Sequence, residues 1–269
     1  MQKSMLLLLF FLQTCLLRAQ DPVIPPSPHS SLSVRGDTLS MEGRTVELDP
    51  QGFPGQIKSF FSSGGIDTGA VASNILAENI HFHFTRLSDG KDIKLQSEGV
   101  TITLQQSTLV EWRAGNVSDE LKMELSGSLR SDGSLSYKVK LTALQDLELK
   151  EITMHIPFEK KVAKKINGVG LGEDYEMGGM LFPRDSTFSW KADSSHAEEA
   201  DIWVGTTNAG LRYSLNGPEW RNEGRGGVTL GIKGKSFLAN NYSGAHSMKK
   251  GEELHYDFDL RITPFKTIR

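Results

Sequence analysis

The sequence predicts an all-β protein, an antiparallel β-sandwich that forms a single domain behind a signal peptide. Three observations predict this fold class. Apolar and polar residues alternate strictly over long runs, turn residues separate these runs at short intervals, and the chain contains 27 glycines. Alternation with a period of two is typical of strands with one buried and one solvent-facing side. Short strands divided by turn signals favour a sandwich or a barrel.

The first residues predict export. Lys3 precedes the apolar run Met5–Leu12, and the small residue Ala19 stands just before a polar stretch. This order is typical of a cleaved signal peptide, which we expect to span residues 1–19. The apolar run is too short to cross a bilayer as a helix, which needs about 20 apolar residues.

Cys15 is the only cysteine of the chain. One alternative makes it the lipid-modified residue of a lipoprotein, although Gln13 and Thr14 are larger than the residues that usually precede such a cysteine. Removal of the signal peptide leaves a mature chain without cysteine. A chain of this size can bury a core without disulfides. We therefore expect an exported bacterial protein, located in the periplasm, on the outer surface or outside the cell.

The chain after the signal peptide divides into a linker and one domain. Residues 20–31 contain four prolines and few large apolar residues, which predicts an extended linker. Residues 32–269 form the predicted β-sandwich domain. The segment Ser131–Ser134 (Ser-Asp-Gly-Ser) separates two alternating runs, as a hairpin turn would. The one helix we expect is short and lies within Gly69–Glu78. The clearest alternating runs are 100–104, 121–125, 135–141 and 254–262.

Composition excludes several classes of function. The formal net charge is −3 and the charges are evenly spread, so we expect no nucleic-acid partner. No later segment is apolar enough to span a membrane. A (β/α)₈ barrel needs about 250 residues with eight alternating helices. Strands occupy nearly all of this chain, so we expect no such barrel in it.

Adjacent carboxylates are the first candidates for catalysis, because sugar hydrolysis commonly uses two of them. Asp119 and Glu120 open an alternating strand, where successive side chains point to opposite faces, so we interpret them as surface residues. Glu173 and Asp174 lie in the glycine-rich segment 168–179, where backbone can approach a ligand closely. They are loop candidates. The sequence contains no phosphate-binding loop and no Gly-x-Ser-x-Gly motif, and we predict no catalytic residue in this chain.

Two histidines share a strand face. His81 and His83 alternate with Phe82 and Phe84, a spacing at which two imidazoles can bind one metal ion. A third ligand at a recognisable spacing is missing. The sequence therefore predicts polar surface histidines, with no metal and no cofactor.

Aromatic residues near strand or loop ends are the candidates for carbohydrate contacts. Trp and Tyr rings stack on the apolar face of a sugar ring, and a few polar groups complete such a site. For each Trp the alternative is a core position, which is the commoner place for Trp in a sandwich. Trp220 lies in the turn-rich, charged segment 216–224 and is the best candidate for exposure. The candidates are Trp220, Trp203, Trp190 and Tyr242.

The order of several motifs resembles a known family. An opening segment at 48–57 is followed, in the last third of the chain, by segments at 202–211, 220–228, 241–246 and 258–266. Together they resemble the N-terminal, non-catalytic β-sandwich domain of glycoside hydrolase family 123. The resemblance covers about residues 32–269.

This resemblance implies a two-part enzyme. In that family the sandwich precedes a (β/α)₈ barrel that carries an adjacent Asp-Glu pair. In that family the Asp orients the substrate's own acetamido group, and the Glu is the general acid/base. The reaction removes β-linked N-acetylgalactosamine. The segment Thr263–Lys266 resembles the crossing into the barrel.

We therefore expect a non-catalytic part of a system that acts on N-acetylhexosamine-containing glycans, with the barrel absent from this chain. Its expected partner is a glycan or a glycoside hydrolase barrel. The alternative is a stand-alone carbohydrate-binding or cell-surface assembly protein.

Overall fold

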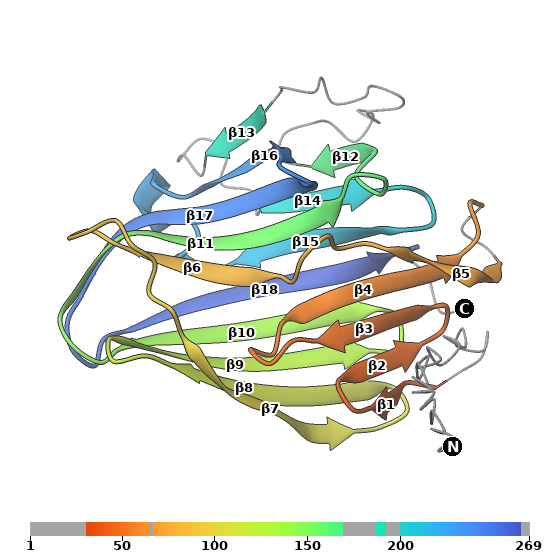
Figure 1. The fold of residues 1–269 in the computed structure, drawn as a ribbon, viewed down its shortest axis with the longest axis horizontal. Coiled ribbons are helices and arrows are strands. Elements are labelled where there is room, and N and C mark those ends of the chain that lie inside the picture. Colours follow the sequence, from red (N-terminus) through yellow and green to blue (C-terminus); the bar gives the residue numbers. More distant parts are fainter. Residues whose placement is uncertain (1–30, 65–66, 169–186, 192–199, 265–269) are drawn as a thin grey trace, which may run out of the picture.

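Three antiparallel sheets make up almost all of the described structure (Figure 1). The computed structural model describes residues 31–64, 67–168, 187–191 and 200–264. The predicted all-β sandwich is confirmed. Within these residues no helix is long and apolar enough to cross a membrane. The predicted signal peptide and nearly all of the predicted linker lie outside the described residues.

The first sheet is a meander of five strands that follow one another along the chain. They are β1 (Ser33–Arg35), β2 (Thr38–Met41), β3 (Arg44–Leu48), β4 (Pro54–Phe61) and β5 (Thr68–Asn74).

The helix expected within Gly69–Glu78 is wrong, because β5 occupies the first part of that segment. Its residues pair with β4, with Thr68 opposite Phe61 and Asn74 opposite Lys58. Backbone pairing with a neighbouring strand outweighs the weak helical preference of the local sequence.

The second sheet has eight strands and forms one layer of the sandwich. In sheet order they are β12 (Lys165–Gly168), β14 (Ala200–Gly205), β15 (Gly210–Asn216), β18 (Glu253–Thr263), β10 (Ser134–Ala143), β9 (Leu121–Arg130), β8 (Leu109–Val117) and β7 (Gln96–Gln105). The third sheet packs against it. Its order is β13 (Thr187–Lys191), β16 (Gly227–Lys233), β17 (Ser236–Met248), β11 (Leu147–Glu159) and β6 (His81–Arg86).

The runs 121–125, 135–141 and 256–262 place their apolar residues in the core, as predicted, whereas the apolar residues of the run 100–104 are half-buried. In β18 the buried apolar side chains are Tyr256, Phe258, Leu260 and Ile262, and the residues between them face outward. The predicted hairpin turn at Ser131–Ser134 joins β9 to β10. Strand alternation therefore determines which side chains reach solvent on each layer.

Phe53 connects the three sheets. It lies in the loop between β3 and β4 and is fully buried. Its ring lies 5.9 Å from Tyr137 on β10 and 5.6 Å from Phe82 on β6, centroid to centroid. Tyr137 in turn stacks on Phe258 at 4.8 Å. One aromatic cluster thus belongs to all three sheets, and the outer faces of the two layers are left for polar residues.

Candidate functional site

The outer face of the eight-stranded sheet carries a dense set of polar and charged side chains. In β9 the buried residues Leu121, Met123 and Leu125 alternate with Lys122 and Glu124, which point away from the core. The same alternation holds in β10 and β18. We call the side of this sheet that bears Glu124 the outer face.

Strand register aligns these outward residues into rows that cross the sheet. Directly paired residues share a face of the sheet, so each row lies on one side. One row runs through Asn216, Asp257, Lys138, Ser126, Arg113 and Thr101. The neighbouring row runs through His255, Lys140, Glu124 and Gly115. Residues from six strands, β7 to β10 together with the later strands β15 and β18, therefore meet on one surface.

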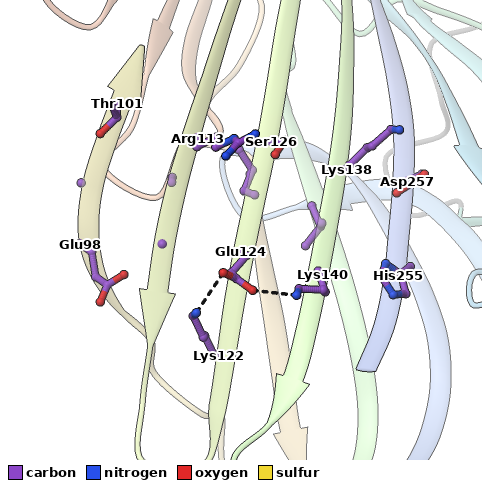
Figure 2. Close-up of a pocket in the computed structure, with 15 residues that line it drawn as sticks. Glu98, Thr101, Arg113, Lys122, Glu124, Ser126, Lys138, Lys140, His255 and Asp257 are labelled. Atoms are coloured by element: carbon purple, nitrogen blue, oxygen red, sulfur yellow. Dashed lines mark hydrogen bonds and ion pairs between the residues drawn. The ribbon is translucent and has the colours of Figure 1, made fainter. Parts of the chain in front are cut away.

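These two rows line a hollow of about 690 Å³ in the outer face (Figure 2). Its size is in the range of sites for small ligands. Its wall alternates positive and negative side chains. The cations are Arg113, Lys122, Lys138 and Lys140, and the carboxylates are Glu98, Glu124 and Asp257.

Glu124 lies between two ammonium groups. Its carboxylate oxygens are 2.9 Å from Lys122 Nζ and 3.0 Å from Lys140 Nζ. Hydrogen bonds from these two lysines lower the pKa of Glu124, and the pKa of Lys140 is raised by Glu124 and Glu253. The hollow thus holds fixed hydrogen-bond donors next to fixed acceptors, a set that can bind a neutral ligand rich in hydroxyl and amide groups.

Trp203 lies on the same outer face. It alternates in β14 with the buried residues Ile202 and Val204, and it pairs with Arg212, which pairs with Arg261 of β18. The row of Arg261 lies four residues along β18 from Asp257, about 14 Å at the usual antiparallel rise. The indole is half-buried. Its Nε1 donates a hydrogen bond to Thr263 Oγ1 at 2.7 Å, which fixes the ring in place.

The exposure expected of Trp220 is wrong. Its side chain is 4% exposed, and its ring lies 4.8 Å from Tyr256 and 6.0 Å from Phe82. Indole Nε1 donates to the carbonyl oxygen of Asp257 at 2.8 Å. The charged neighbours of Trp220 form a turn at the surface while the ring itself fills the core. A buried indole cannot stack on a sugar in this structure.

Of the other candidates, the structure places Tyr242 and the backbone of Trp190 in the third sheet, away from the outer face. Tyr242 lies on the opposite side of the sandwich, on β17, and is half-buried. Burial raises the pKa of Tyr242, and the charge of Glu151 raises it further. Trp190 lies on β13 opposite Val228, and the structure does not describe its side chain. Glu173 and Asp174 lie outside the described residues.

The adjacent pair Asp119 and Glu120 has a structural partner. It lies in the turn between β8 and β9, and Glu120 accepts a hydrogen bond from Nε of Arg86 at 2.7 Å. Arg86 belongs to β6 in the third sheet. This ion pair therefore joins the two layers of the sandwich.

The motifs of the last third also build structure. Asn222 Nδ2 donates to the backbone carbonyls of Ser243 and, at 3.1 Å, Ala245. Ser243 Oγ lies 2.8 Å from the hydroxyl of Tyr256 and 2.9 Å from His246 Nε2. These side chains satisfy one another's hydrogen bonds beside the ring of Trp220. The segments 220–228 and 241–246, which resemble the family, therefore form a packed corner of the fold. The outer face could not be recognised from the sequence in this way, because its residues come from separate strands.

One protein family matches most of the chain. The family described as "Glycoside hydrolase 123, third domain" matches residues 32–264. No curated protein gave a match. Among solved structures, a galactose mutarotase related enzyme from Lactobacillus acidophilus is 8% identical with a TM-score of 0.43, over 87% of this chain and 97% of that one.

Two further solved structures have a similar sequence identity and TM-score. A putative aldose 1-epimerase from Escherichia coli K12 is 10% identical with a TM-score of 0.48, over 84% of this chain and 97% of that one. A heparinase III is 8% identical with a TM-score of 0.43, over 88% of this chain and 36% of that one.

Proposed function

Since the chain belongs to the glycoside hydrolase 123 third-domain family, we propose that it is a non-catalytic domain that binds N-acetylhexosamine-containing glycans for a secreted hydrolase system. The family confirms the resemblance noted in the sequence, although its description names a third domain instead of an N-terminal one. The observation that carries the proposal is the polar outer face, with its hollow and with Trp203 on the same side of the sheet.

The chemistry of the outer face fits an amino sugar. A sugar offers hydroxyl groups that donate and accept, and its acetamido group adds one N–H donor and one carbonyl acceptor. Lys138 and Lys140 are donors, and Asp257 and Glu98 are acceptors. Trp203 offers an apolar surface on the same face for the C–H side of a neighbouring sugar unit. We therefore expect an oligosaccharide to run from the hollow toward β14.

Isothermal titration calorimetry with soluble N-acetylgalactosamine-containing oligosaccharides tests this proposal. We expect Lys138→Ala and Trp203→Ala to weaken binding by about tenfold or more each, which corresponds to about 1.4 kcal/mol. Tyr242→Ala is the matched control, because Tyr242 is an aromatic residue on the opposite side of the sandwich. Its affinity should equal that of the unmodified chain. Near-ultraviolet circular dichroism would verify that each variant keeps its fold.

Two results would contradict the proposal. If Tyr242→Ala weakens glycan binding while Lys138→Ala and Trp203→Ala do not, the glycan binds on the other side of the sandwich. Hydrolysis of an aryl N-acetyl-β-galactosaminide by this chain alone, lost in Glu173→Gln or Asp174→Asn, would show that the domain is catalytic. Export and a barrel partner remain predictions from the sequence.

A further inference from the structure

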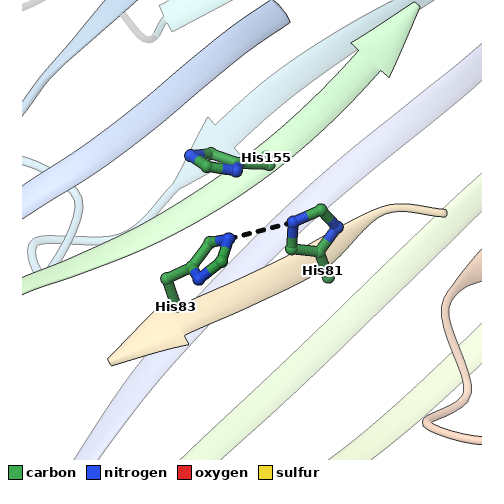
Figure 3. Close-up of side chains that lie close together, drawn as sticks. All are labelled: His81, His83 and His155. Carbon is green, nitrogen blue, oxygen red and sulfur yellow. Dashed lines mark hydrogen bonds between the residues drawn. The ribbon is translucent and has the colours of Figure 1, made fainter. Parts of the chain in front are cut away.

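Three histidines meet on the outer side of the third sheet, opposite the face described above. His81 and His83 lie on β6, and His155 lies on the neighbouring strand β11, where it pairs with His81. One imidazole nitrogen from each ring lies within 4.8 Å of the other two (Figure 3). The ligand missing from the sequence pattern of His81 and His83 is thus supplied by the adjacent strand.

Each of the three rings uses one nitrogen for a hydrogen bond to a protein oxygen. His81 Nδ1 donates to the carbonyl oxygen of Asn79 at 2.7 Å, and His83 Nδ1 donates to a carboxylate oxygen of Asp92. His155 Nε2 donates to Asn240 Oδ1 at 2.9 Å. Metal-binding histidines typically donate their second nitrogen in this way, which fixes the tautomer and aims the free lone pair at the ion.

The contact between His81 and His83 needs a positive species between the rings. Their Nε2 atoms are 3.0 Å apart. Both Nδ1 atoms carry the hydrogen that faces an oxygen acceptor, so in the neutral rings both Nε2 atoms carry a lone pair. Two lone pairs at this distance repel each other unless a proton or a metal ion lies between them. Two nitrogens bound tetrahedrally to Zn²⁺ are about 3.3 Å apart, given Zn–N bonds of about 2.0–2.1 Å.

We propose that His81, His83 and His155 bind one divalent transition-metal ion of the Zn²⁺ class. Imidazole is a preferred ligand of such ions, and three histidines leave a fourth position for water or a ligand oxygen. That position is accessible, because His83 and His155 line a hollow of about 460 Å³ with Asn240. His81 and His83 also border a second hollow of about 180 Å³. One nitrogen of His155 lies within 4.8 Å of the ligand nitrogens of the other two rings, and we expect its side chain to rotate toward them when the ion binds.

Metal content and affinity of the full chain, prepared without a histidine tag, test this proposal. After loading with Zn²⁺ and dialysis, elemental analysis should find one equivalent of zinc, and Co²⁺ should give the visible absorption bands of a four-coordinate site. His83→Ala and His155→Ala should each weaken zinc binding at least 100-fold. Asp92→Asn, which alters the oxygen that accepts from His83, should weaken it about 10–100-fold.

His255→Ala is the matched control, because His255 is exposed on the other side of the sandwich, and its zinc affinity should not change. Unfolding midpoints measured in chelator would verify that the variants fold, so that weaker zinc binding cannot be attributed to unfolding. The proposal is overturned if the unmodified chain retains no zinc, which would assign the short His81–His83 contact to a proton. It is equally overturned if the triple variant lacking all three histidines still retains one equivalent. Neither result depends on glycan binding, so this site and the proposed function fail separately.

Discussion

At the scale of single residues, one half-buried histidine of the sandwich is held by two hydroxyl groups. His246 is half-buried, and its Nε2 lies 2.9 Å from Ser243 Oγ and 3.1 Å from the hydroxyl of Tyr256. Burial lowers the pKa of His246, and the charge of Arg225 lowers it further. The folded protein therefore keeps this ring neutral in a range of pH where a solvated histidine takes up a proton.

This lowered pKa predicts that acid destabilises the fold through His246. The unfolded chain binds a proton at His246 once the pH falls below about 6.5, whereas the folded chain resists it, so stability falls with pH from there. We expect His246→Gln to lose less stability than the unmodified chain between pH 7.5 and 5.5. The slopes should differ by at most about 1.4 kcal/mol per pH unit, the value for one proton.

Urea unfolding at several pH values, in chelator, measures these slopes. The pKa values of His81 and His155 are also lowered by burial, but both proteins contain them and their effect cancels in the comparison. Equal slopes in His246→Gln and the unmodified chain would show that His246 is not linked to folding.

At the scale of elements, the sequence predicts a strand wherever the strand's own residues carry the signal. The alternation in β9, β10 and β18 is visible because each strand buries one face. β5 carries no such alternation, and only its pairing with β4 makes it a strand. The histidine cluster and the outer face could not be predicted from single strands either, because pairing between different strands brings their residues together. The predicted exposure of Trp220 was wrong for a related reason. The residues next to Trp220 in the sequence are polar, but the residues around its ring in the structure are not its sequence neighbours.

The pairing of β8 with β9 predicts a strict requirement for glycine. Gly127 lies directly opposite Trp112, and a Cβ placed on Gly127 would be 2.3 Å from the indole ring. Trp112 is buried, with Nε1 donating to the carbonyl oxygen of Gly52 at 2.9 Å, so the ring cannot move aside freely. We expect Gly127→Ala to destabilise the fold by about 1–3 kcal/mol, the usual cost of overpacking a core.

Urea unfolding measures this cost. Ser128→Ala is the control, since it adds no atoms at the next position of β9, whose side chain faces outward, and it should change stability by less than about 0.5 kcal/mol. A Gly127→Ala variant as stable as Ser128→Ala would mean that the indole has room to shift.

At the scale of the whole molecule, the first sheet must be fastened to a sandwich that is otherwise built from later strands. Phe53 makes an apolar connection, and Arg44 at the start of β3 makes a polar one. Asn208, in the turn between β14 and β15, adds hydrogen bonds to Ser59 and Phe61 of β4. Arg44 is 1% exposed, donates through Nη2 to the carbonyl oxygen of Pro264 just after β18, and lies 5.1 Å from the ring of Phe61. Burial lowers the pKa of Arg44 to about 10, while the charges of Glu42 and Asp132 oppose this shift.

Removing the Arg44 side chain should loosen the first sheet and the end of β18 together. Arg44→Ala leaves the carbonyl of Pro264 without this donor, so we expect a loss of about 1.5–3 kcal/mol in the free energy of unfolding, the range for hydrogen bonds to charged groups. Hydrogen exchange locates the effect. Amides of β3, β4 and the end of β18 should exchange faster, while β9 and β10 keep their protection, because local opening follows the elements that lose contacts. Arg35→Ala, at an exposed arginine of the same sheet, should leave both measurements unchanged. Uniformly faster exchange across all three sheets in Arg44→Ala would instead mean that the first sheet and the sandwich unfold as one cooperative unit.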